Sequence, residues 1–392
     1  MMGARPLILG GGVAPFGRHR DGSNWRDWVR VAGAEALEDA GLEPDEIDAV
    51  VVASESDFLS LQVNPGPVVL GELGLAGRPV VRIEGGGASG GLALREGMAQ
   101  IMAGLARRVL VVGFEAAAGH LAPASVGLVY GLSFDAEVDG LAGATAVALY
   151  ALSIAEHKVL YGTTAEQLAH VSVKNRANAV GNPWAHKPMQ VSVADVLASP
   201  MIARPYRKLD CSLASDGAAA IVLAHADAAP AASRPRSRIA GSGVGSDHAR
   251  IGDRTERHAF RAKRLAAEAA YAMAGATASD IQVAEVCDPF TGAEIQSLEA
   301  LGLAAPGEAG PATADGTFDP AGRLPVNLSG GLLGQGGAPG ATGIAQAVTM
   351  DRLLGGRYRD GQVGGDFRRG LIDIHGGMAT LAAVHVMERV EP

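Results

Sequence analysis

The chain has 392 residues, of which 48% are hydrophobic, and its formal net charge is −9 at pH 7. This length and apolar content predict a large buried core in one compact, two-part body. The acidic balance gives no reason to expect nucleic acid as a partner, and no apolar run approaches the ~20 residues of a bilayer span. The N-terminal stretch MMGARPLILGGG lacks the long apolar segment of a signal peptide, so we expect a cytoplasmic protein.

The first clear elements lie in residues 31–53, VAGAEALEDAGLEPDEIDAVVVA. This pattern predicts an amphipathic helix that ends at Gly41, a short acidic turn and a buried strand of β-branched residues. Residues 265–287, LAAEAAYAMAGATASDIQVAEVC, follow the same plan with Gly275 in the place of Gly41. We therefore expect an α/β fold of two duplicated halves, with both sheets covered on both faces.

A second pair of segments also repeats. Residues 85–104 and residues 336–356 each place a glycine-rich turn before an alanine-rich helix. The alternative is that helices rich in alanine and glycine resemble one another through composition alone.

The first half also carries a long insertion, at about residues 115–215, which holds most of its aromatic residues and histidines. Such insertions commonly cover or line a site. A stretch rich in Ala, Pro and Ser, residues 225–238, then separates the strand AAAIVLA from the strand RIAGSGVG. We place the domain boundary near residue 232, which gives an N-terminal half of residues 1–232 and a C-terminal half of residues 233–392.

The chain contains two cysteines, Cys211 and Cys287. They lie too far apart in the sequence for a metal-binding knuckle, and a lone disulfide is unusual in the cytoplasm. The sequence therefore indicates neither a metal site nor a disulfide.

Four segments resemble the thiolase family, in the branch of the sterol-carrier-protein thiolases, in their order and spacing. They are YGTTAEQLAHVSVKNRANAVGNPWA, SPMIARPYRKLDCSLASDGAAAIVLA, DPFTGAEIQSLEALGL and VNLSGGLLGQGGAPGATGIAQAV. The resemblance covers nearly the whole chain. It implies a five-layered αβαβα thiolase fold, a homodimer, and a coenzyme A thioester bound in a pocket where the two halves meet.

The resemblance also implies that the family's nucleophile and its activator are missing. Thiolases carry a nucleophilic cysteine in a Cys-Ala-Ser-Gly turn at a helix N-terminus, but here residues 87–90 read GASG. The activating histidine of Gly-His-Pro is replaced in GAP, residues 337–339. Without a side chain at position 87 no acyl-enzyme forms there; the alternative is Ser89 as a substitute nucleophile. The expected substrate-binding frame is Gly87, Ser89, Gly337, Ala338 and Pro339.

The family's His-Asp-Cys-Phe motif, whose histidine points at the thioester oxygen, reads CDPF at residues 287–290. Cys287 is a weaker hydrogen-bond donor than imidazole, so it predicts a poor oxyanion hole. The alternative is a small buried thiol that packs under the strand. Asp288 and Phe290 match the family, and we expect them to fix the turn beside the substrate.

The family's last motif, which holds the acid or base for the α-proton, aligns with DIHGGMA. This alignment puts Asp373 at the family's cysteine and His375 at its first glycine. A buried pair of this kind can serve as general acid and base near neutral pH. We predict that Asp373 and His375 lie at the base of the same pocket as Gly87; the alternative is a solvent-facing pair at the end of a strand.

Two functions fit this altered site. The first is an enzyme similar to the aldolase subunits of steroid side-chain degradation, which also lack the cysteine and cleave a carbon–carbon bond in a β-hydroxyacyl-CoA without a covalent intermediate. That similarity implies a zinc-ribbon and OB-fold partner chain that helps to hold the CoA. Those aldolases use tyrosines as the base, whereas the corresponding loop position here is Gly337 or Ala338. Asp373 and His375 are therefore the predicted catalysts, and Cys287 or backbone N–H groups near Gly87 and Gly337 are the predicted donors to the thioester oxygen.

The second function is a non-catalytic thiolase-like subunit that binds acyl-CoA or stabilises a partner enzyme. For either function the CoA thioester is the expected ligand. We expect a homodimer whose interface includes residues 80–106, with Val80, Val81, Leu92 and Leu94 buried in it.

Overall fold

The computed structural model describes residues 5–119, 121–230, 236–361, 363 and 365–390. Within these residues the main sheet has the strand order β3-β2-β4-β7-β1-β8-β11-β10-β9. Its strands are β1 (Leu7–Gly17), β2 (Ala49–Ala53), β3 (Val80–Ile83), β4 (Arg108–Ala116), β7 (Asp216–Ala224), β8 (Ser237–Ser246), β9 (Val283–Glu285), β10 (Arg369–Gly376) and β11 (Leu381–Arg389). A separate pair joins β5 (Met201–Ala203) to β6 (Tyr206–Arg207). The predicted domain boundary near residue 232 lies outside the described residues.

Helices surround and separate the strands. The longer ones are α1 (Trp25–Ala40), α4 (Ser89–Met102), α6 (Ala146–Tyr161), α7 (Ala165–Asn178), α9 (Arg261–Ala274), α10 (Thr291–Ala300) and α13 (Pro339–Leu354). The shorter ones are α2 (Asp57–Ser60), α3 (Pro65–Glu72), α5 (Pro123–Gly131), α8 (Val193–Ala198), α11 (Ala309–Ala314) and α12 (Gly331–Gly334). Within the described ranges, no helix combines the length and the apolar character needed to cross a membrane.

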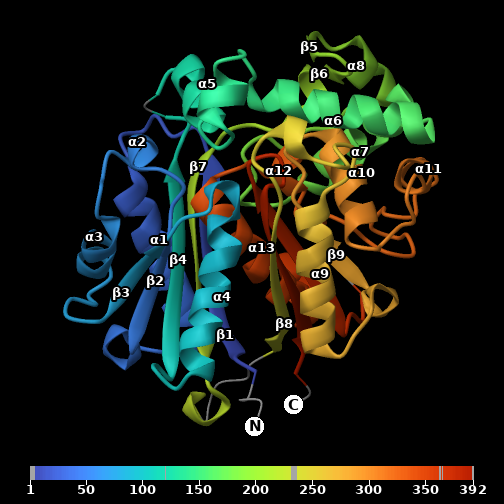
Figure 1. The fold of residues 1–392 in the computed structure, drawn as a ribbon. Helices are drawn as coiled ribbons and strands as arrows, with labels where there is room; N and C mark the ends of the chain where they lie inside the picture. The colour runs from blue at the N-terminus through green and yellow to red at the C-terminus, as the bar shows by residue number, and fades with distance from the viewer. Residues whose placement is uncertain (1–4, 120, 231–235, 362, 364, 391–392) are drawn as a thin grey trace.

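The elements stack in five layers (Figure 1). α1 packs on β1 and β7 and covers one outer face, while α9 packs on β8 and β11 and covers the other. α4 and α13 lie between the two halves of the sheet and contact strands of both. Among the residues that the structure describes, β1 and β8 join the halves by pairing Leu7 with Arg238 and Ile8 with Ser237. The expected αβαβα order is therefore present, with the two sheets joined at one edge into a single mixed sheet.

The predicted internal repeat is visible at the helix ends. α1 ends at Gly41 with φ 66°, and α9 ends at Gly275 with φ 65°. Glycine adopts this left-handed conformation without a steric penalty, so both halves stop their outer helix in the same way. α4 and α13 also occupy equivalent central positions, each behind a glycine-rich turn.

The two central helices meet at glycines near their N-terminal ends. A Cβ on Gly90 of α4 would lie 3.0 Å from Gly340 O and from Gly343 N of α13. A Cβ on Gly343 would lie 2.7 Å from Gly91 N. These are backbone atoms of packed helices, so side chains here would force the helices apart. The glycines are therefore explained by the close approach of α4 and α13.

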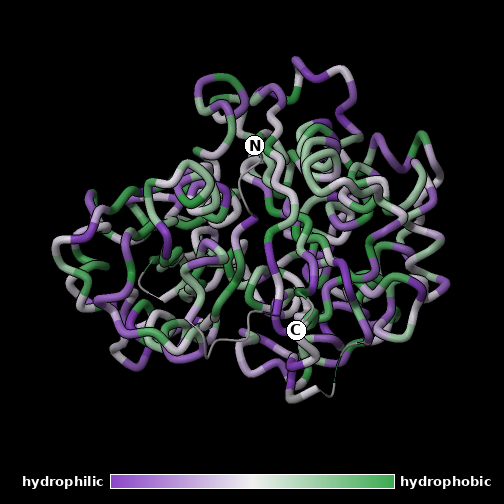
Figure 2. The backbone as a smooth tube through the Cα atoms, turned by 90° about the horizontal axis from the view of Figure 1, so that it is seen from below, coloured by the Kyte–Doolittle hydropathy of each residue, from purple (hydrophilic) through white to green (hydrophobic). Residues whose placement is uncertain are grey.

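The expected insertion occupies residues 117–215, between β4 and β7, and contains helices α5 to α8. In Figure 1, α5, α6 and α8 lie together at the top of the molecule, over one end of the sheet. α7 packs against α10, α11 and α12 of the second half. Viewed from below, the two halves lie side by side, and hydrophilic residues are frequent in the loops around the outside (Figure 2).

The predicted dimer interface is only partly available at the surface. β3 forms one edge of the sheet, and Val81 on it is 41% exposed. Leu94 of α4, in contrast, is fully buried among the core residues between the sheet and the central helices. The prediction that Leu94 contributes to a dimer interface is wrong, because its own chain already covers it.

Candidate active site

A cavity of about 340 Å³ lies between the insertion and the second half of the chain. The insertion supplies much of its wall, as expected, through residues that include Val126, Tyr130, Phe134, Tyr150 and Leu213. The predicted site residues that line it are Gly87, Cys287, Phe290, Gly337, Pro339 and His375. The structure thus brings together the turns before α4 and α13, the segment after β9 and the end of β10.

Ser89 and Ala338 do not belong to the cavity wall, although we predicted both as substrate-binding residues. Both are fully buried. The Ser89 hydroxyl donates to Gly86 O at 2.6 Å and accepts from Gly85 N at 3.0 Å. Ser89 therefore ties the turn together, and its oxygen is not free to act as a nucleophile.

Gly87 faces a backbone carbonyl where a side chain would project. A Cβ added to Gly87 would lie 2.5 Å from His375 O and 3.7 Å from Gly376 Cα. The carbonyl belongs to β10, so it cannot withdraw without moving the strand. A cysteine at this position does not fit the observed backbone, and glycine itself offers no nucleophilic side chain.

His375 faces the cavity from β10 and pairs with Tyr150 of α6. Tyr150 Oη lies 2.5 Å from His375 Nε2 and 2.6 Å from Gly377 O. Because a carbonyl can only accept, the tyrosine proton goes to Gly377 O and His375 Nε2 donates its hydrogen to Tyr150. Burial, followed by the charges of Lys263 and Arg254, lowers the pKa of His375 well below its usual value. The imidazole is therefore neutral, and its Nδ1 is an acceptor without a hydrogen-bond partner.

Asp373 does not line the cavity. Its fully buried carboxylate forms an ion pair with Lys263 Nζ at 2.5 Å and accepts from Cys287 N at 3.2 Å. Lys263 also donates to Ser297 Oγ at 2.6 Å. Burial raises the pKa of Asp373, and Lys263 opposes this effect. The predicted Asp373–His375 pair is wrong, because α9 supplies a lysine that takes the carboxylate instead.

Cys287 presents a protonated thiol to the cavity. Burial raises its pKa to about 12, and the opposing effect of Lys263 is smaller. A thiol of this kind is a weak hydrogen-bond donor. The Gly337 N–H, which we also predicted as a donor to the thioester oxygen, already donates to Leu213 O at 3.0 Å and is not available.

Both cysteines are expected to resist alkylation in the folded protein. Burial raises the pKa of Cys211 and of Cys287 to about 12. At about pH 8 the thiolate fraction is then only roughly one in ten thousand. Intact-mass analysis after iodoacetamide treatment should show labels only when denaturant is present, and rapid labelling of the native chain would contradict this assignment.

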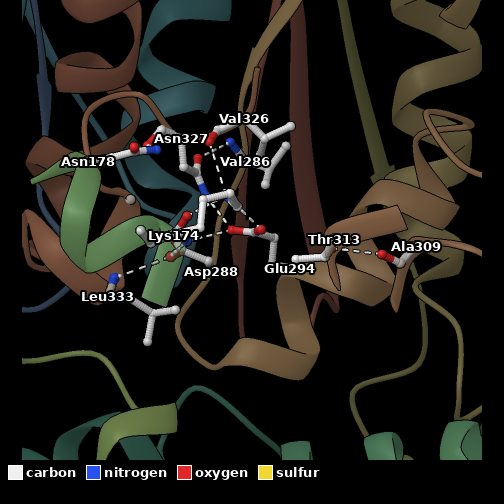
Figure 3. Close-up of polar contacts among 12 residues, drawn as sticks. Lys174, Asn178, Val286, Asp288, Glu294, Ala309, Thr313, Val326, Asn327 and Leu333 are labelled. Atoms are coloured by element: carbon white, nitrogen blue, oxygen red, sulfur yellow. Dashed lines mark hydrogen bonds and ion pairs between the residues drawn. The ribbon is translucent and has the colours of Figure 1, made fainter. Parts of the chain in front are cut away.

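Asp288 fixes the backbone beside the cavity and does not line it. Its carboxylate accepts from Leu332 N at 2.6 Å and from Asn175 Nδ2 at 2.7 Å. Figure 3 shows the cluster around it, in which Lys174 of α7 reaches Glu294 Oε1 at 3.0 Å. Burial, and then the charge of Glu294, raise the pKa of Asp288. Since Leu332 lines the cavity, this network holds one wall in place, and Asp288 supports the site from behind.

Sequence reasoning missed Glu55, which follows β2 by two residues. It lines the cavity, and its Oε1 accepts from Ser133 Oγ at 3.0 Å. Burial raises the pKa of Glu55 to about 7. The available signal was a carboxyl group just beyond the carboxyl end of a fully buried strand, a common position for site residues in α/β proteins.

The cavity suits an organic ligand with a large apolar part. Aromatic and aliphatic side chains dominate its wall, and its volume of about 340 Å³ falls in the usual range for small-molecule sites. Within the part of the chain that the structure describes, no group of three or more His, Cys, Asp or Glu residues is placed to hold a metal ion.

Known proteins similar to this chain identify its family. Residues 7–188 match the model described as thiolase, N-terminal domain, and residues 243–389 match the thiolase C-terminal domain-like model. An acetyl-CoA acetyltransferase of Methanothermobacter thermautotrophicus is 38% identical over 97% of this chain and 99% of its own length. A steroid side-chain-cleaving aldolase of Thermomonospora curvata is 32% identical over 88% of this chain and 90% of its own. The solved Ltp2–ChsH2(DUF35) aldolase has a TM-score of 0.83 and 25% identity, covering 99% of this chain and 98% of that one. The chain therefore belongs to the thiolase superfamily, in the branch that contains the sterol-carrier-protein thiolases and the steroid side-chain-cleaving aldolases.

Proposed function

We propose that this protein is a carbon–carbon lyase that cleaves β-hydroxyacyl-CoA thioesters without forming an acyl-enzyme. The observation that carries the proposal is the cavity wall at Gly87, where a backbone carbonyl takes the space of a nucleophile while titratable groups remain around the same cavity. Retro-aldol cleavage needs a base and a donor to the thioester oxygen, and it needs no nucleophile. The likeness to a steroid side-chain-cleaving aldolase supports this reaction class.

In this proposal Cys287 and His375 contact the substrate, and Asp373 positions Cys287. The Cys287 thiol, which stays protonated, donates to the thioester oxygen. The neutral His375 offers Nδ1, the ring nitrogen that has no partner in the protein, as an acceptor to the bound ligand. The ion pair of Asp373 with Lys263 acts from behind, because Asp373 also binds the backbone N–H of Cys287.

The acyl group that enters the cavity is apolar. Phe134, Phe290 and Ile374 supply wall surface that a hydrocarbon or ring-containing acyl chain covers better than a polar one. Coenzyme A is the carrier of this acyl group, in keeping with the acetyl-CoA acetyltransferase to which the chain is similar.

We also propose two protein partners. A second copy of the chain pairs along β3, where Val81 is exposed at the edge of the sheet. A zinc-ribbon and OB-fold chain helps to hold the CoA, and the similarity to the Ltp2–ChsH2(DUF35) aldolase supports this second partner.

A non-catalytic acyl-CoA-binding subunit is the second candidate function. It is favoured by the turn before α13, where Ala338 is fully buried and the Gly337 N–H is already bonded to Leu213 O. This turn therefore offers the substrate neither an acid nor a base.

One experiment distinguishes the lyase from the non-catalytic subunit. The purified protein is titrated calorimetrically with butyryl-CoA and then incubated with a series of β-hydroxyacyl-CoA thioesters, whose products are followed by mass spectrometry. We expect binding, release of a carbonyl compound together with a shortened acyl-CoA, and no acyl adduct on the protein. Binding without cleavage across the series would favour the non-catalytic subunit, and a stable acyl adduct or thiolysis activity would refute both functions.

A further inference from the structure

The cavity described above borders a second one. The second cavity has a volume of about 380 Å³ and lies beside the glycine turn before α4. Glu55, Ser133 and Gly377 line both cavities. The wall of the second cavity is more polar, since it also includes Ser56, Glu84 and Thr380. Glu55 therefore stands at the junction between an apolar chamber and a polar one.

The backbone places Glu55 firmly at this junction. Its N–H donates to Glu115 Oε2 at 2.7 Å, and the same oxygen accepts from Gly340 N at 3.3 Å. Glu115 is fully buried and thus connects the end of β2 to the start of α13. Only one oxygen of the Glu55 carboxylate is hydrogen-bonded. Oε1 accepts from Ser133 Oγ at 3.0 Å, whereas the buried Oε2 has no hydrogen-bond partner. One carboxylate oxygen is therefore unpaired within the protein, and the residue borders both cavities.

The surroundings of Glu55 allow both of its protonation states near neutral pH. Burial raises its pKa to about 7, the hydrogen bond from Ser133 lowers it, and the charge of Glu84 raises it. A catalytic acid or base works best when its pKa lies near the working pH. Asp373 is engaged by Lys263, and the pKa of His375 lies well below its usual value, so neither matches this requirement as well. The other ionisable groups around the junction are Arg82, Glu84, Glu115 and Tyr130.

We propose that Glu55 is the catalytic residue that transfers the proton in this cavity, and that the second cavity is the route by which its proton exchanges with water. The proposal rests on the function proposed above. The Glu55 carboxylate accepts the proton of the substrate's β-hydroxyl; the carbon–carbon bond then breaks, the β-carbon becomes a carbonyl, and the bonding electrons pass into the thioester as an enolate. Protonated Glu55 returns the proton to the α-carbon of this enolate. One residue thus serves both steps, and no external oxidant, reductant or proton is consumed.

The return of the proton to the α-carbon can be tested in the reverse direction, and this test does not need the natural substrate. Glu55 should remove an α-proton from a saturated thioester and return a deuteron when the solvent is D₂O. We expect the wild-type protein to incorporate deuterium at the α-carbon of butyryl-CoA, as measured by mass spectrometry. Glu55→Gln should lower this exchange by ~10²–10⁴-fold, the usual contribution of a general base. Its affinity for butyryl-CoA should stay within about twofold, because the amide has the shape of the protonated acid.

The control is Glu268→Gln, which neutralises an exposed carboxylate on the outer helix α9 and should leave the exchange unchanged. Exchange by Glu55→Gln at the wild-type rate would overturn the role of Glu55 and leave the proposed lyase standing. Binding of butyryl-CoA without exchange in the wild type would overturn Glu55 as the proton carrier and favour the non-catalytic subunit. Absence of binding would overturn the proposed function, and the assignment of Glu55 with it.

Two further variants separate catalysis from a structural role. Ser133→Ala removes the hydrogen bond that lowers the pKa of Glu55, so the midpoint of the exchange rate against pH should move to higher pH. Glu84→Gln removes the like charge that raises it, so the midpoint should move to lower pH. A merely structural Glu55 would leave both midpoints where they are, which would contradict the proposal even if Glu55→Gln fails to fold.

Discussion

Replacing Lys263 with methionine is expected to lower the free energy of unfolding by about 3–5 kcal/mol, the usual cost of breaking a buried ion pair from one side. Lys263 and Asp373 are both fully buried, and Asp373 Oδ1 already lacks a hydrogen-bond partner. The substitution keeps most of the side-chain volume but leaves the carboxylate without its cation. Urea denaturation followed by circular dichroism measures the loss.

The pH dependence of this loss identifies Asp373 as its origin. Burial raises the pKa of Asp373 above its ordinary value of 3.8, and removing Lys263 raises it further. A carboxyl group whose pKa is higher in the folded state holds its proton longer there, so stability falls as pH rises from the unfolded pKa to the folded one. The penalty of Lys263→Met should therefore shrink towards acidic pH. Adding Asp373→Asn should restore at least half of the lost stability, and a double variant as unstable as the single one would contradict the ion-pair explanation.

Introducing a cysteine at residue 87 is expected to destabilise the protein without creating thiolase activity. The new Cβ would lie 2.5 Å from His375 O, and overpacking of this kind costs about 1–3 kcal/mol. Ala338, where the resemblance places the family's activating histidine, also carries no group that could activate a thiol. Gly87→Cys should therefore show a lower free energy of unfolding and no thiolysis of acetoacetyl-CoA.

Gly71→Ala provides the matched control for this variant. A Cβ on Gly71, within α3, meets nothing within 4 Å, so alanine should be neutral or should stabilise by about 0.4–1 kcal/mol. A Gly87→Cys protein as stable as the wild type would show that β10 moves aside easily. Thiolysis by that variant would show that the site still supports covalent chemistry.

The sequence was most informative where local chemistry determines the structure. Gly41 and Gly275 end their helices because a left-handed residue after a helix favours glycine, and this preference acts over only a few residues. The order of the family-like motifs over the whole chain predicted the fold. The length and aromatic content of the insertion predicted that it lines the cavity.

The sequence was least informative where a charged side chain finds its partner far away in the chain. Asp373 and His375 lie on the same face of β10, and this spacing favoured the prediction of a pair. The actual partner of Asp373 is Lys263, which is 110 residues away, and no residue near Asp373 indicates this contact. Glu55 escaped notice for a similar reason. Burial raises the pKa of Glu55, and a hydrogen bond from Ser133, 78 residues away, opposes this effect; neither is visible in the residues around Glu55.

Because α4 and α13 meet at glycines, the packing of the two central helices is largely independent of the residues that would carry out a reaction. The helices touch through main-chain atoms of Gly90, Gly340 and Gly343, so their spacing does not depend on the side chains in the turns that precede them. The two halves therefore keep their spacing when the chemistry of these turns changes, within the space that His375 O leaves at position 87. A turn without a nucleophile then still borders a shaped cavity, and a carboxyl group elsewhere on the cavity wall, such as that of Glu55, is available for a different reaction.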